Sequence, residues 1–235
     1  MEELELSQLI TLNIFTNCCK SAPDTSVMKI CVDSFKEQFK IDITNISVNV
    51  FIDPNPSPEK YDEYVKNIKE YFNKCNNLNI YKTDGLSYSY IMSIDIAKTP
   101  ILFQLEHDWQ FKKIDFSAEH LTRVMMKYGL PYVKFLRHSS DIPMYDFKNY
   151  DGIFITKCAY PNNWPHMISI EEGMRRRPYI KTRAGSSGIE YSILTAGITK
   201  DHNYLCQINE ENIIHIDGRE NTLETVKNNF ILLKN

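Results

Sequence analysis

The sequence predicts an α/β fold with a mostly parallel central sheet flanked by helices, followed by an irregular C-terminal half. Strand-like and helix-like segments alternate with loops of modest length up to Leu136, which is typical of a parallel sheet. Ile101, Leu102, Phe103 and Leu105 form a short apolar run after Pro100, as expected for a strand buried on both faces. The chain has 235 residues, enough for a full core, and no repeat or long linker divides it. We therefore expect a single domain.

The first elements follow the order strand, helix, strand. Residues Leu9–Thr16 are rich in β-branched and aromatic side chains and predict the first strand. A polar loop at 17–24 leads to a predicted helix at Ser26–Phe39, where apolar residues recur at helical spacing. Residues Ile46–Ile52 alternate between apolar and small polar side chains, which predicts a second strand ending at Asp53.

Prolines follow this second strand. The segment 53–58, Asp-Pro-Asn-Pro-Ser-Pro, is expected to form a loop because proline has no amide hydrogen to donate. Ser57 and Pro58 have the residue types preferred at the N-cap and first position of a helix. That helix would place its apolar stripe, Tyr61, Val65, Ile68 and Phe72, on the sheet.

The next segments lead into and out of the buried strand. Residues Leu78–Thr83 predict a third strand, and a helix is expected from Gly85 to about Lys98. After the buried strand, Ser117 is a predicted N-cap for a helix that stops at Gly129 and Pro131. Later elements are expected as strands at 132–136, 153–156 and 212–216, a loop at 160–166 and a short helix at 222–228.

Three polar residues, Glu106, His107 and Asp108, follow the buried strand directly. Ligands of open α/β sheets bind outside the carboxyl ends of the strands, and carboxylates are seldom buried without a partner. In an extended segment Glu106 and Asp108 would point to one side and His107 to the other. Carboxylates suit Mg²⁺ or Mn²⁺, which usually share them with a substrate phosphate. The alternative is structural: one acid caps the next helix and the other pairs with Arg123.

Composition and motifs exclude several classes of protein. A net charge of −3 provides no basic excess for nucleic acid, so we expect no nucleic-acid partner. The six cysteines are scattered, the N-terminus is acidic, and no apolar run is long enough for a transmembrane segment, so a cytoplasmic protein is expected. The dinucleotide-binding glycine motif, the P-loop and the Gly-x-Ser-x-Gly elbow are all absent from the sequence.

Together these features resemble the GT-A glycosyltransferases, in which a Rossmann-like half ends in an acidic motif and an irregular acceptor-side half follows. In that family an Asp-x-Asp motif holds a divalent metal on the diphosphate of a nucleotide sugar. Here the motif is Glu106-His107-Asp108, with Glu in place of the first Asp. The resemblance implies a metal ligand at Asp108 and contacts of Glu106 and His107 with the donor. It also implies a nucleotide-sugar-binding half at 1–111 and an acceptor-side half at 112–235.

The same resemblance assigns further site residues. The family lines its base and ribose pocket with the loop after the first strand and an acid ending the second, which implicates Thr16, Asn17 and Asp53. Gly188-Ile-Glu190-Tyr is similar to the Gly-x-Glu-Asp segment that supplies the catalytic base of inverting members, so Glu190 is the candidate base. A late histidine completes the metal site in several members, which implicates His215.

Each of these assignments has competitors. Other acids that could act as the base are Glu171, Glu172, Asp141 and Asp146, and His202 competes with His215. The arginines Arg175, Arg176, Arg177 and Arg183 would either close over the diphosphate or form a solvated charge run. Trp109 and Trp164 would either stack on sugar rings or anchor packed loops.

The sequence therefore predicts a metal-dependent glycosyltransferase that uses Mn²⁺ or Mg²⁺ and a nucleotide-diphosphate sugar, with inversion at the sugar. A glycan or glycoprotein is the expected acceptor. Two rival hypotheses are a nucleotidyltransferase of similar sheet architecture and a non-catalytic carbohydrate-binding or interaction protein. A nucleotidyltransferase normally has a glycine-rich basic loop after the first strand, whereas residues 17–24 contain one Lys and no Gly.

Overall fold

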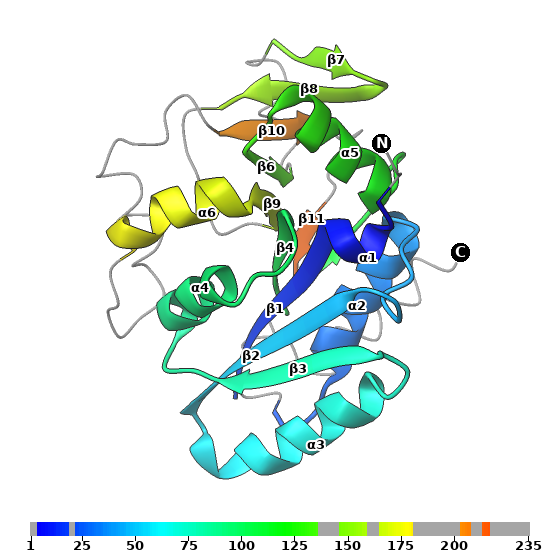
Figure 1. Ribbon diagram of the computed structural model, residues 1–235. Helices are drawn as coiled ribbons and strands as arrows, with labels where there is room; N and C mark the ends of the chain where they lie inside the picture. The colour runs from blue at the N-terminus through cyan, green and yellow to red at the C-terminus, as the bar shows by residue number, and fades with distance from the viewer. Residues whose placement is uncertain are drawn as a thin grey trace.

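The computed structural model describes residues 4–18, 22–135, 146–158, 165–180, 203–207 and 213–216. Within these residues nine strands form one sheet (Figure 1). Their order across the sheet is β3 (Asn77–Lys82), β2 (Ser47–Pro56), β1 (Ile10–Cys18), β4 (Ile101–Glu106), β9 (His166–Ser169), β6 (Tyr132–Phe135), β10 (Tyr204–Gln207), β8 (Ile153–Lys157) and β7 (Lys148–Tyr150).

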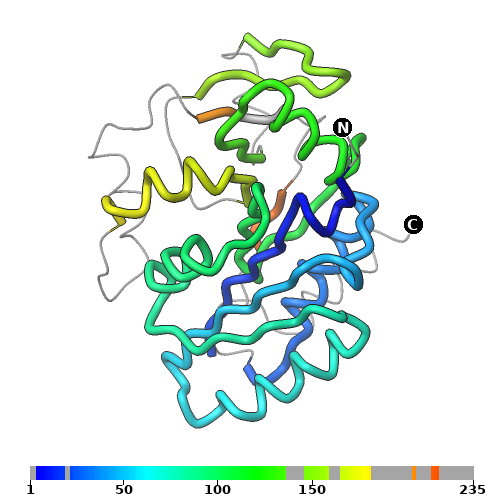
Figure 2. The backbone as a smooth tube through the Cα atoms, in the orientation of Figure 1, coloured from blue at the N-terminus to red at the C-terminus, as the bar shows by residue number. Residues whose placement is uncertain are grey.

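The first four strands across the sheet, β3, β2, β1 and β4, pair in parallel. β9 runs antiparallel between β4 and β6, and β10 is again parallel to β6. The predicted α/β fold with a mostly parallel central sheet is thereby confirmed. Figure 2 shows the early segments, in blue and cyan, at one end of this sheet and the later green and yellow segments at the other.

Helices cover both faces of the sheet. α2 (Ser26–Gln38), α3 (Tyr61–Tyr71) and α5 (Ala118–Tyr128) contribute to the larger core cluster, which contains Leu12, Phe103 and Val133. α4 (Leu86–Asp95) and the segment around α6 (Ile170–Arg176) pack on the other face, against residues such as Phe15 and Phe51. The remaining helices are short: α1 (Leu6–Leu9), η1 (Pro58–Lys60) and η3 (Arg177–Tyr179).

Aromatic rings fill the core between α2 and the sheet. Phe103 of β4 lies edge-on to Phe35 of α2 and to Phe39, which follows α2, with ring centroids 4.7 and 5.3 Å apart, and stacks on Phe135 of β6 at 5.5 Å. All four side chains are fully buried. These contacts fix β4, whose carboxyl end carries the acidic motif, against both halves of the chain.

A second, two-stranded ribbon lies beside the sheet. It pairs β5 (Trp109–Phe111) with β11 (Ile213–His215) in antiparallel fashion, with His215 opposite Trp109. The sequence predicts β11 but not β5, which has only three residues. The ribbon brings the end of the described chain next to the acidic motif.

Local sequence signals account well for several elements. The predicted helices at Ser26–Phe39 and after Ser117 are found as α2 and α5, and the Ser117 hydroxyl accepts a hydrogen bond from His120 N–H at 3.1 Å. Gly129 ends α5 in the left-handed conformation, with φ of 63°. At this position glycine avoids the steric cost that other residues would incur.

The expected proline loop is wrong in its extent. β2 continues through Asp53 to Pro56, and Pro56 aligns with Cys18 of β1 after a shift in register at Asn17 and Cys18. β3 pairs with β2 only as far as Ile52, so the prolines lie where no β3 partner needs their missing amide hydrogens.

Other elements were missed or misplaced by the sequence prediction. His166, expected in a loop, begins β9, and α6 follows where the sequence suggested only a charge run. The predicted Ser57 cap makes no side-chain hydrogen bond, and a 3₁₀ turn precedes α3. The expected helix at 222–228 lies outside the described residues.

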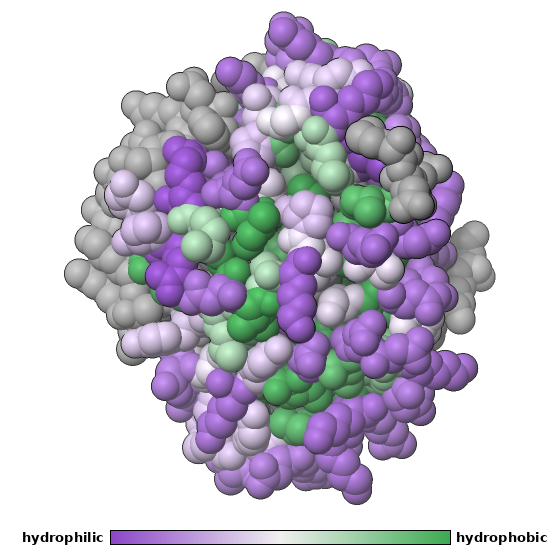
Figure 3. Space-filling model, in the orientation of Figure 1, coloured by the Kyte–Doolittle hydropathy of each residue, from purple (hydrophilic) through white to green (hydrophobic). Residues whose placement is uncertain are grey.

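The surface in the orientation of Figure 3 mixes hydrophobic and hydrophilic areas, with green hydrophobic residues visible in its middle. Large exposed apolar side chains on α4, α6 and η3 are Tyr88, Met174 and Tyr179. None of the described helices has the length and apolar character needed to span a bilayer.

Candidate functional site

The carboxyl ends of β1, β2 and β4 lie together at one edge of the sheet. The register aligns Asn17 of β1 with Asp53 of β2, and Phe15 of β1 with Glu106 of β4. Parallel pairing therefore brings the predicted site residues of three separate segments to one edge, where open α/β sheets bind their ligands.

On the β1 and β2 side of this edge, the predicted nucleotide-binding residues differ in their partners. The Thr16 hydroxyl is buried and hydrogen-bonds the Tyr64 hydroxyl at 2.8 Å. Asp53 accepts from the backbone and side-chain N–H groups of Asn55 at 2.9 and 3.0 Å. The Asn17 side-chain oxygen is buried with no hydrogen-bond partner among the described residues. Asn17 therefore has the strongest geometric case for a ligand contact in this group.

Gly85 brings the start of α4 close to Asp53. Its φ of +100° favours glycine, and a Cβ built at this position would lie 3.8 Å from Asp53 Oδ2. The connection between β3 and α4 therefore lies next to Asp53, beside the carboxyl end of β2.

The acidic motif is not the extended segment that the sequence suggested. Glu106 ends β4, and His107 and Asp108 form a turn before β5 begins at Trp109. Glu106 and Asp108 consequently do not alternate as neighbours on one strand. The predicted arrangement, with both carboxylates on one side, assumed an extended backbone at 106–108, and this assumption was wrong.

Two residues far apart in the sequence meet at this turn. His215 Nε2 lies 3.1 Å from Asp108 Oδ2, across a separation of 107 residues. The Asp108 carbonyl also accepts a 2.7 Å hydrogen bond from Ile216 N–H, which follows β11 directly. The β5–β11 ribbon thus brings the two predicted metal ligands side by side.

The Asp108 carboxylate is buried, ionised and incompletely satisfied. Burial raises its pKa, but the hydrogen bond from His215 and the charges of His107 and His215 outweigh that effect and hold the pKa below its usual range. The Oδ1 oxygen is buried and has no hydrogen-bond partner within the described ranges. A buried carboxylate oxygen without a partner is costly unless a ligand or ion occupies the position.

These two side chains fit part of the coordination shell of a divalent cation. Ligand atoms about 2.1 Å from an octahedral ion are separated by roughly 3 Å from their neighbours, close to the Asp108–His215 distance. In the described part of the chain, no cluster of three or more His, Cys, Asp and Glu side chains forms a complete metal site. Mg²⁺ usually keeps several waters and binds substrate phosphates, which would add ligands to these two side chains.

The other residues of the turn are held by the protein. His107 is buried, and its backbone N–H donates to the Phe15 carbonyl at 3.0 Å. The Trp109 ring is also buried and lies against His215, with ring centroids 4.8 Å apart. Trp109 consequently offers little free face for a sugar, contrary to one sequence-based hypothesis.

A small pocket lies between α4 and the sheet, next to Glu106. Its water-accessible space is about 10 Å³, enough for about one water molecule and too small for a sugar ring. Its lining includes Glu106, Gln104, Tyr90 and His166. The Gln104 side-chain oxygen is buried without a hydrogen-bond partner among the described residues, so the pocket has an unused acceptor in its wall.

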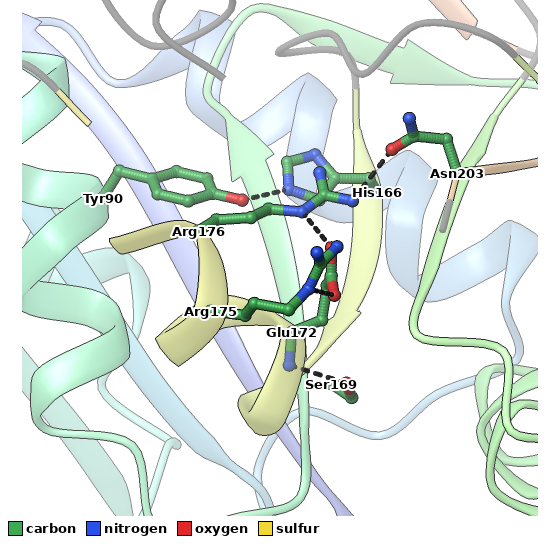
Figure 4. A network of polar contacts seen from close by, with 7 residues as sticks. All are labelled: Tyr90, His166, Ser169, Glu172, Arg175, Arg176 and Asn203. Carbon is green, nitrogen blue, oxygen red and sulfur yellow. Dashed lines mark hydrogen bonds and ion pairs between the residues drawn. The ribbon is translucent and has the colours of Figure 1, made fainter. Parts of the chain in front are cut away.

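A buried polar network, which the sequence did not reveal, joins α6 to Asn203 and lies near two residues of this pocket, Tyr90 and His166 (Figure 4). Arg176 donates to Glu172 at 2.6 Å and to Asn203 at 2.8 Å, and its guanidinium lies 4.1 Å from the Tyr132 ring centroid. Tyr90 and His166 form a separate 2.8 Å hydrogen bond nearby. The network fixes α6 on the sheet.

The network corrects two hypotheses. Glu172 binds both Arg175 and Arg176, each through contacts of 2.6–2.7 Å, so it is a poor candidate for a free catalytic base. Arg176 is fully buried, so it belongs neither to a solvated run nor to a loop that closes over a phosphate, whereas Arg175 and Arg177 are partly exposed and pair with Glu172 and Asp95. The sequence did contain a signal for α6: Ser169 followed three residues later by Glu172 is a typical helix start, and the arginines follow one turn later.

Several predicted residues lie outside the described part of the chain. They include the candidate base Glu190 and the competing or flanking residues Asp141, Trp164, Arg183 and His202. Asp146 is described and exposed, and Glu171 is exposed at the start of α6.

Comparisons with known proteins give a clear result only for structure. No protein-family model matches the sequence, and no curated protein matches it. Solved structures do match: S. aureus TarS superposes with a TM-score of 0.60 at 10% identity, over 87% of this chain. The chain has the GT-A fold.

Two other matches have the same fold. A mannosyltransferase from Pyrobaculum calidifontis, solved with GDP-Man and Mn²⁺, matches 83% of this chain with a TM-score of 0.52 and 10% identity. The 4-diphosphocytidyl-2C-methyl-D-erythritol synthase from Anaerococcus prevotii matches 97% of both chains with a TM-score of 0.54 and 12% identity. The GT-A fold therefore accommodates both glycosyl transfer and nucleotidyl transfer among these neighbours.

The chain is shorter than its glycosyltransferase neighbours. It spans 36% of TarS, 65% of TarS residues 1–349 solved with UDP-GlcNAc, and 55% of the mannosyltransferase. At these identities the comparison shows the fold alone, so the chemistry must be argued from this chain's own site.

Proposed function

We propose that this protein is a metal-dependent glycosyltransferase that transfers a sugar from a nucleotide-diphosphate sugar to an acceptor hydroxyl with inversion. The observation that carries this proposal is the Asp108–His215 pair at the carboxyl edge of the sheet, with one buried carboxylate oxygen unpartnered among the described residues. Structural neighbours solved with UDP-GlcNAc, or with GDP-Man and Mn²⁺, support the same substrate class.

In this proposal Asp108 and His215 hold Mn²⁺ or Mg²⁺ against the donor diphosphate. When bound, the ion neutralises the charge of the departing nucleoside diphosphate. Asn17 and Asp53 contact the nucleoside, Thr16 shapes its pocket through Tyr64, and Glu106 and His107 border the donor. Residues 1–111 thus form the nucleotide-sugar-binding half.

Residues 112–235 form the proposed acceptor-side half. Glu190 is the proposed base: its carboxylate takes the proton of the acceptor hydroxyl as that oxygen attacks the anomeric carbon opposite the leaving group. The proposed acceptor is a glycan or glycoprotein. We propose a cytoplasmic location because the cysteine spacing lacks the pattern of a disulfide framework.

A second candidate function is nucleotidyl transfer, because the erythritol synthase has the same fold and matches 97% of this chain with a TM-score of 0.54. The loop after β1 opposes it, since residues 17–24 contain no glycine and a single lysine for a triphosphate. We therefore favour glycosyl transfer.

The two functions are separated by a substrate screen. Incubating the protein with UDP- and GDP-sugars and Mn²⁺ should release nucleoside diphosphate slowly, even without an acceptor, because water can replace the acceptor hydroxyl. A nucleotidyltransferase would instead consume CTP or UTP with a sugar phosphate and release diphosphate. Release of nucleoside diphosphate at equal rates with and without Mn²⁺ would contradict the proposed metal dependence.

The variant Glu190→Gln tests the proposed base. It should bind the donor with unchanged affinity and lose transfer by roughly 100-fold or more, since general-base catalysis contributes about 10²–10⁴-fold. Glu171→Gln is a matched control in an exposed acid that competes for the role. If Glu171→Gln loses transfer and Glu190→Gln does not, the base is misassigned.

A further inference from the structure

Helix α2 hydrogen-bonds the backbone of the acidic turn from the side opposite β11. Cys31 is fully buried, and its thiol donates to the Glu106 carbonyl at 3.4 Å, while its sulfur also accepts a hydrogen bond from Trp109 N–H. One side chain therefore bridges the two residues that flank His107 and Asp108. Burial raises the pKa of Cys31, so the thiol keeps the proton that it donates.

The next turn of α2 continues this pattern. The Ser34 hydroxyl accepts from Phe111 N–H at 3.0 Å and donates to the Cys31 carbonyl at 2.8 Å. Trp109 and Phe111 are two residues apart on β5, so their N–H groups point to the same edge of the strand. Gln38, one turn further along α2, accepts from Ile114 N–H at 3.1 Å.

The polar side chains of α2 thus accept hydrogen bonds from backbone N–H groups of β5, as the carbonyl groups of a neighbouring strand would. β11 pairs with one edge of β5, and Cys31 and Ser34 satisfy backbone groups on the other edge. Cys31 also belongs to the apolar core, but a buried hydroxyl such as that of Ser34 is costly unless it is hydrogen-bonded, so core packing alone does not account for it. Their hydrogen bonds fix the backbone on either side of Asp108.

We propose that Cys31 and Ser34 are positioning residues for Asp108. They hold the turn so that the Asp108 carboxylate faces His215 and stays available to a divalent cation. This inference rests on the proposed function for its metal, but the placement of Asp108 against His215 is measurable without any ligand. α2 also begins directly after the loop that follows β1, so the same helix connects the nucleotide side of the edge to the metal side.

The test compares Cys31→Ala and Ser34→Ala with a matched control. Thr122→Val removes an equally buried hydroxyl that bonds only within its own helix, to the Ala118 carbonyl at 2.8 Å. Three properties are measured: amide hydrogen exchange of residues 109–111, the NMR signals of the His215 ring, and Mn²⁺ affinity in the presence of UDP.

The two α2 variants should speed exchange at 109–111 by about 3- to 10-fold, the equivalent of one hydrogen bond. The His215 ring signals should move toward those of Asp108→Asn, and Mn²⁺ affinity should fall roughly 10-fold, as for residues that orient metal ligands. Metal-free UDP affinity should stay within about twofold, since α2 does not hold the nucleotide through these groups. Cys31→Ser, which keeps a donor and an acceptor, should restore most of the affinity.

Unchanged His215 signals in both variants, or changes equal to those of Thr122→Val, would overturn the inference. Faster exchange with unchanged Mn²⁺ affinity would also overturn it, because the hydrogen bonds would then serve stability alone. If the wild-type protein binds no Mn²⁺, the proposed function fails on its own account, and the His215 signals still decide whether Cys31 and Ser34 position Asp108.

Discussion

Asp108 and Glu172 are both buried carboxylates whose pKa values lie below their ordinary range, but their partners differ. Glu172 is bound by Arg175 and Arg176, and the second of these arginines is itself fully buried. Asp108 contacts His215 through one oxygen, while its other oxygen has no partner in the described residues. The local sequence does not predict this difference: Asp108 directly precedes the short strand β5, and Glu172 lies in the short helix α6.

The difference shows which buried acid can act on a ligand. Glu172 forms ion pairs within the protein, and its partner Arg176 contacts Tyr132 of β6 and Asn203, the residue before β10. Asp108 has a partner for Oδ2 only; its buried Oδ1 has none among the described residues, which is energetically unfavourable without a ligand. It lies at the carboxyl edge of the sheet, where open α/β sheets bind their ligands. The carboxylate of Glu172 is thus engaged by arginines of α6, whereas the carboxylate of Asp108, in the turn between β4 and β5, is the one that the proposed function assigns to a ligand.

The largest expected effect is on stability in the α6 network. Arg176→Ala removes the buried partner of the buried Glu172, and breaking such a pair typically costs about 3–5 kcal/mol. Urea unfolding measures this loss. Arg123→Ala, which removes an exposed i,i+4 partner of Glu119, is the control and should cost less than about 1 kcal/mol. Equal losses of unfolding free energy in the two variants would show that the buried ion pair of α6 stabilises the fold no more than an exposed pair does.

The second effect is a pH dependence of the same network. The pKa of Glu172 is lowered in the folded state because the contributions of Arg175 and Arg176 outweigh the effect of burial. Ionised Glu172 therefore stabilises the fold above its unfolded-state pKa of about 4.5, and this contribution is lost as the pH falls through the folded-state value. Unfolding free energies of wild type and Glu172→Gln should differ at pH 7 and converge toward pH 3. A constant difference across this range would contradict the assignment.

A smaller effect is expected at the partner of Asp108. His215→Ala should weaken Mn²⁺ affinity about 10-fold, less than the loss of the carboxylate, because Mg²⁺ and Mn²⁺ prefer oxygen ligands. Electron paramagnetic resonance of free Mn²⁺ in the presence of UDP measures the affinity. His120→Ala changes a histidine on α5 and is the control. Equal affinities of wild type and His215→Ala would remove His215 from the site.

The smallest effect is expected at Thr16. Its hydroxyl is already bonded to Tyr64, so Thr16→Val should cost about 1 kcal/mol of stability and change UDP affinity less than twofold. Asn17→Ala should weaken UDP more, because the Asn17 oxygen has no partner among the described residues. Calorimetric titration with UDP compares the two variants, and a larger loss in Thr16→Val would reverse their proposed roles.

The sequence predicted most clearly those features that depend on neighbouring residues. The stripe of α2, the Ser117 cap and the Gly129 stop each follow from side chains within one or two turns, and all were found. The run of Ile101, Leu102, Phe103 and Leu105 likewise identified a buried strand, because apolar side chains on both faces are typical of burial on both faces.

Features that depend on distant pairing were missed. β5 and β9 are three and four residues long and carry no periodic signal of their own, so their partners in space define them. The family resemblance assigned Asp108 and His215 to one metal site, but no local sequence pattern predicts their contact across 107 residues, which depends on the β5–β11 ribbon. The hydrogen bonds of Cys31 and Ser34 to the turn follow from the same tertiary placement.

The most direct test of this account is a calorimetric titration of UDP and GDP with and without Mn²⁺, using wild type, Asp108→Asn and Asp151→Asn. Asp151 is a surface acid paired with Lys127 and is the matched control. At least one nucleotide should bind wild type and the control in a Mn²⁺-dependent manner, and Asp108→Asn should lose about 100-fold or more of this affinity, since even outer-shell changes cost 10- to 100-fold. Binding that is independent of Mn²⁺, or that survives in Asp108→Asn, would contradict the proposed metal site.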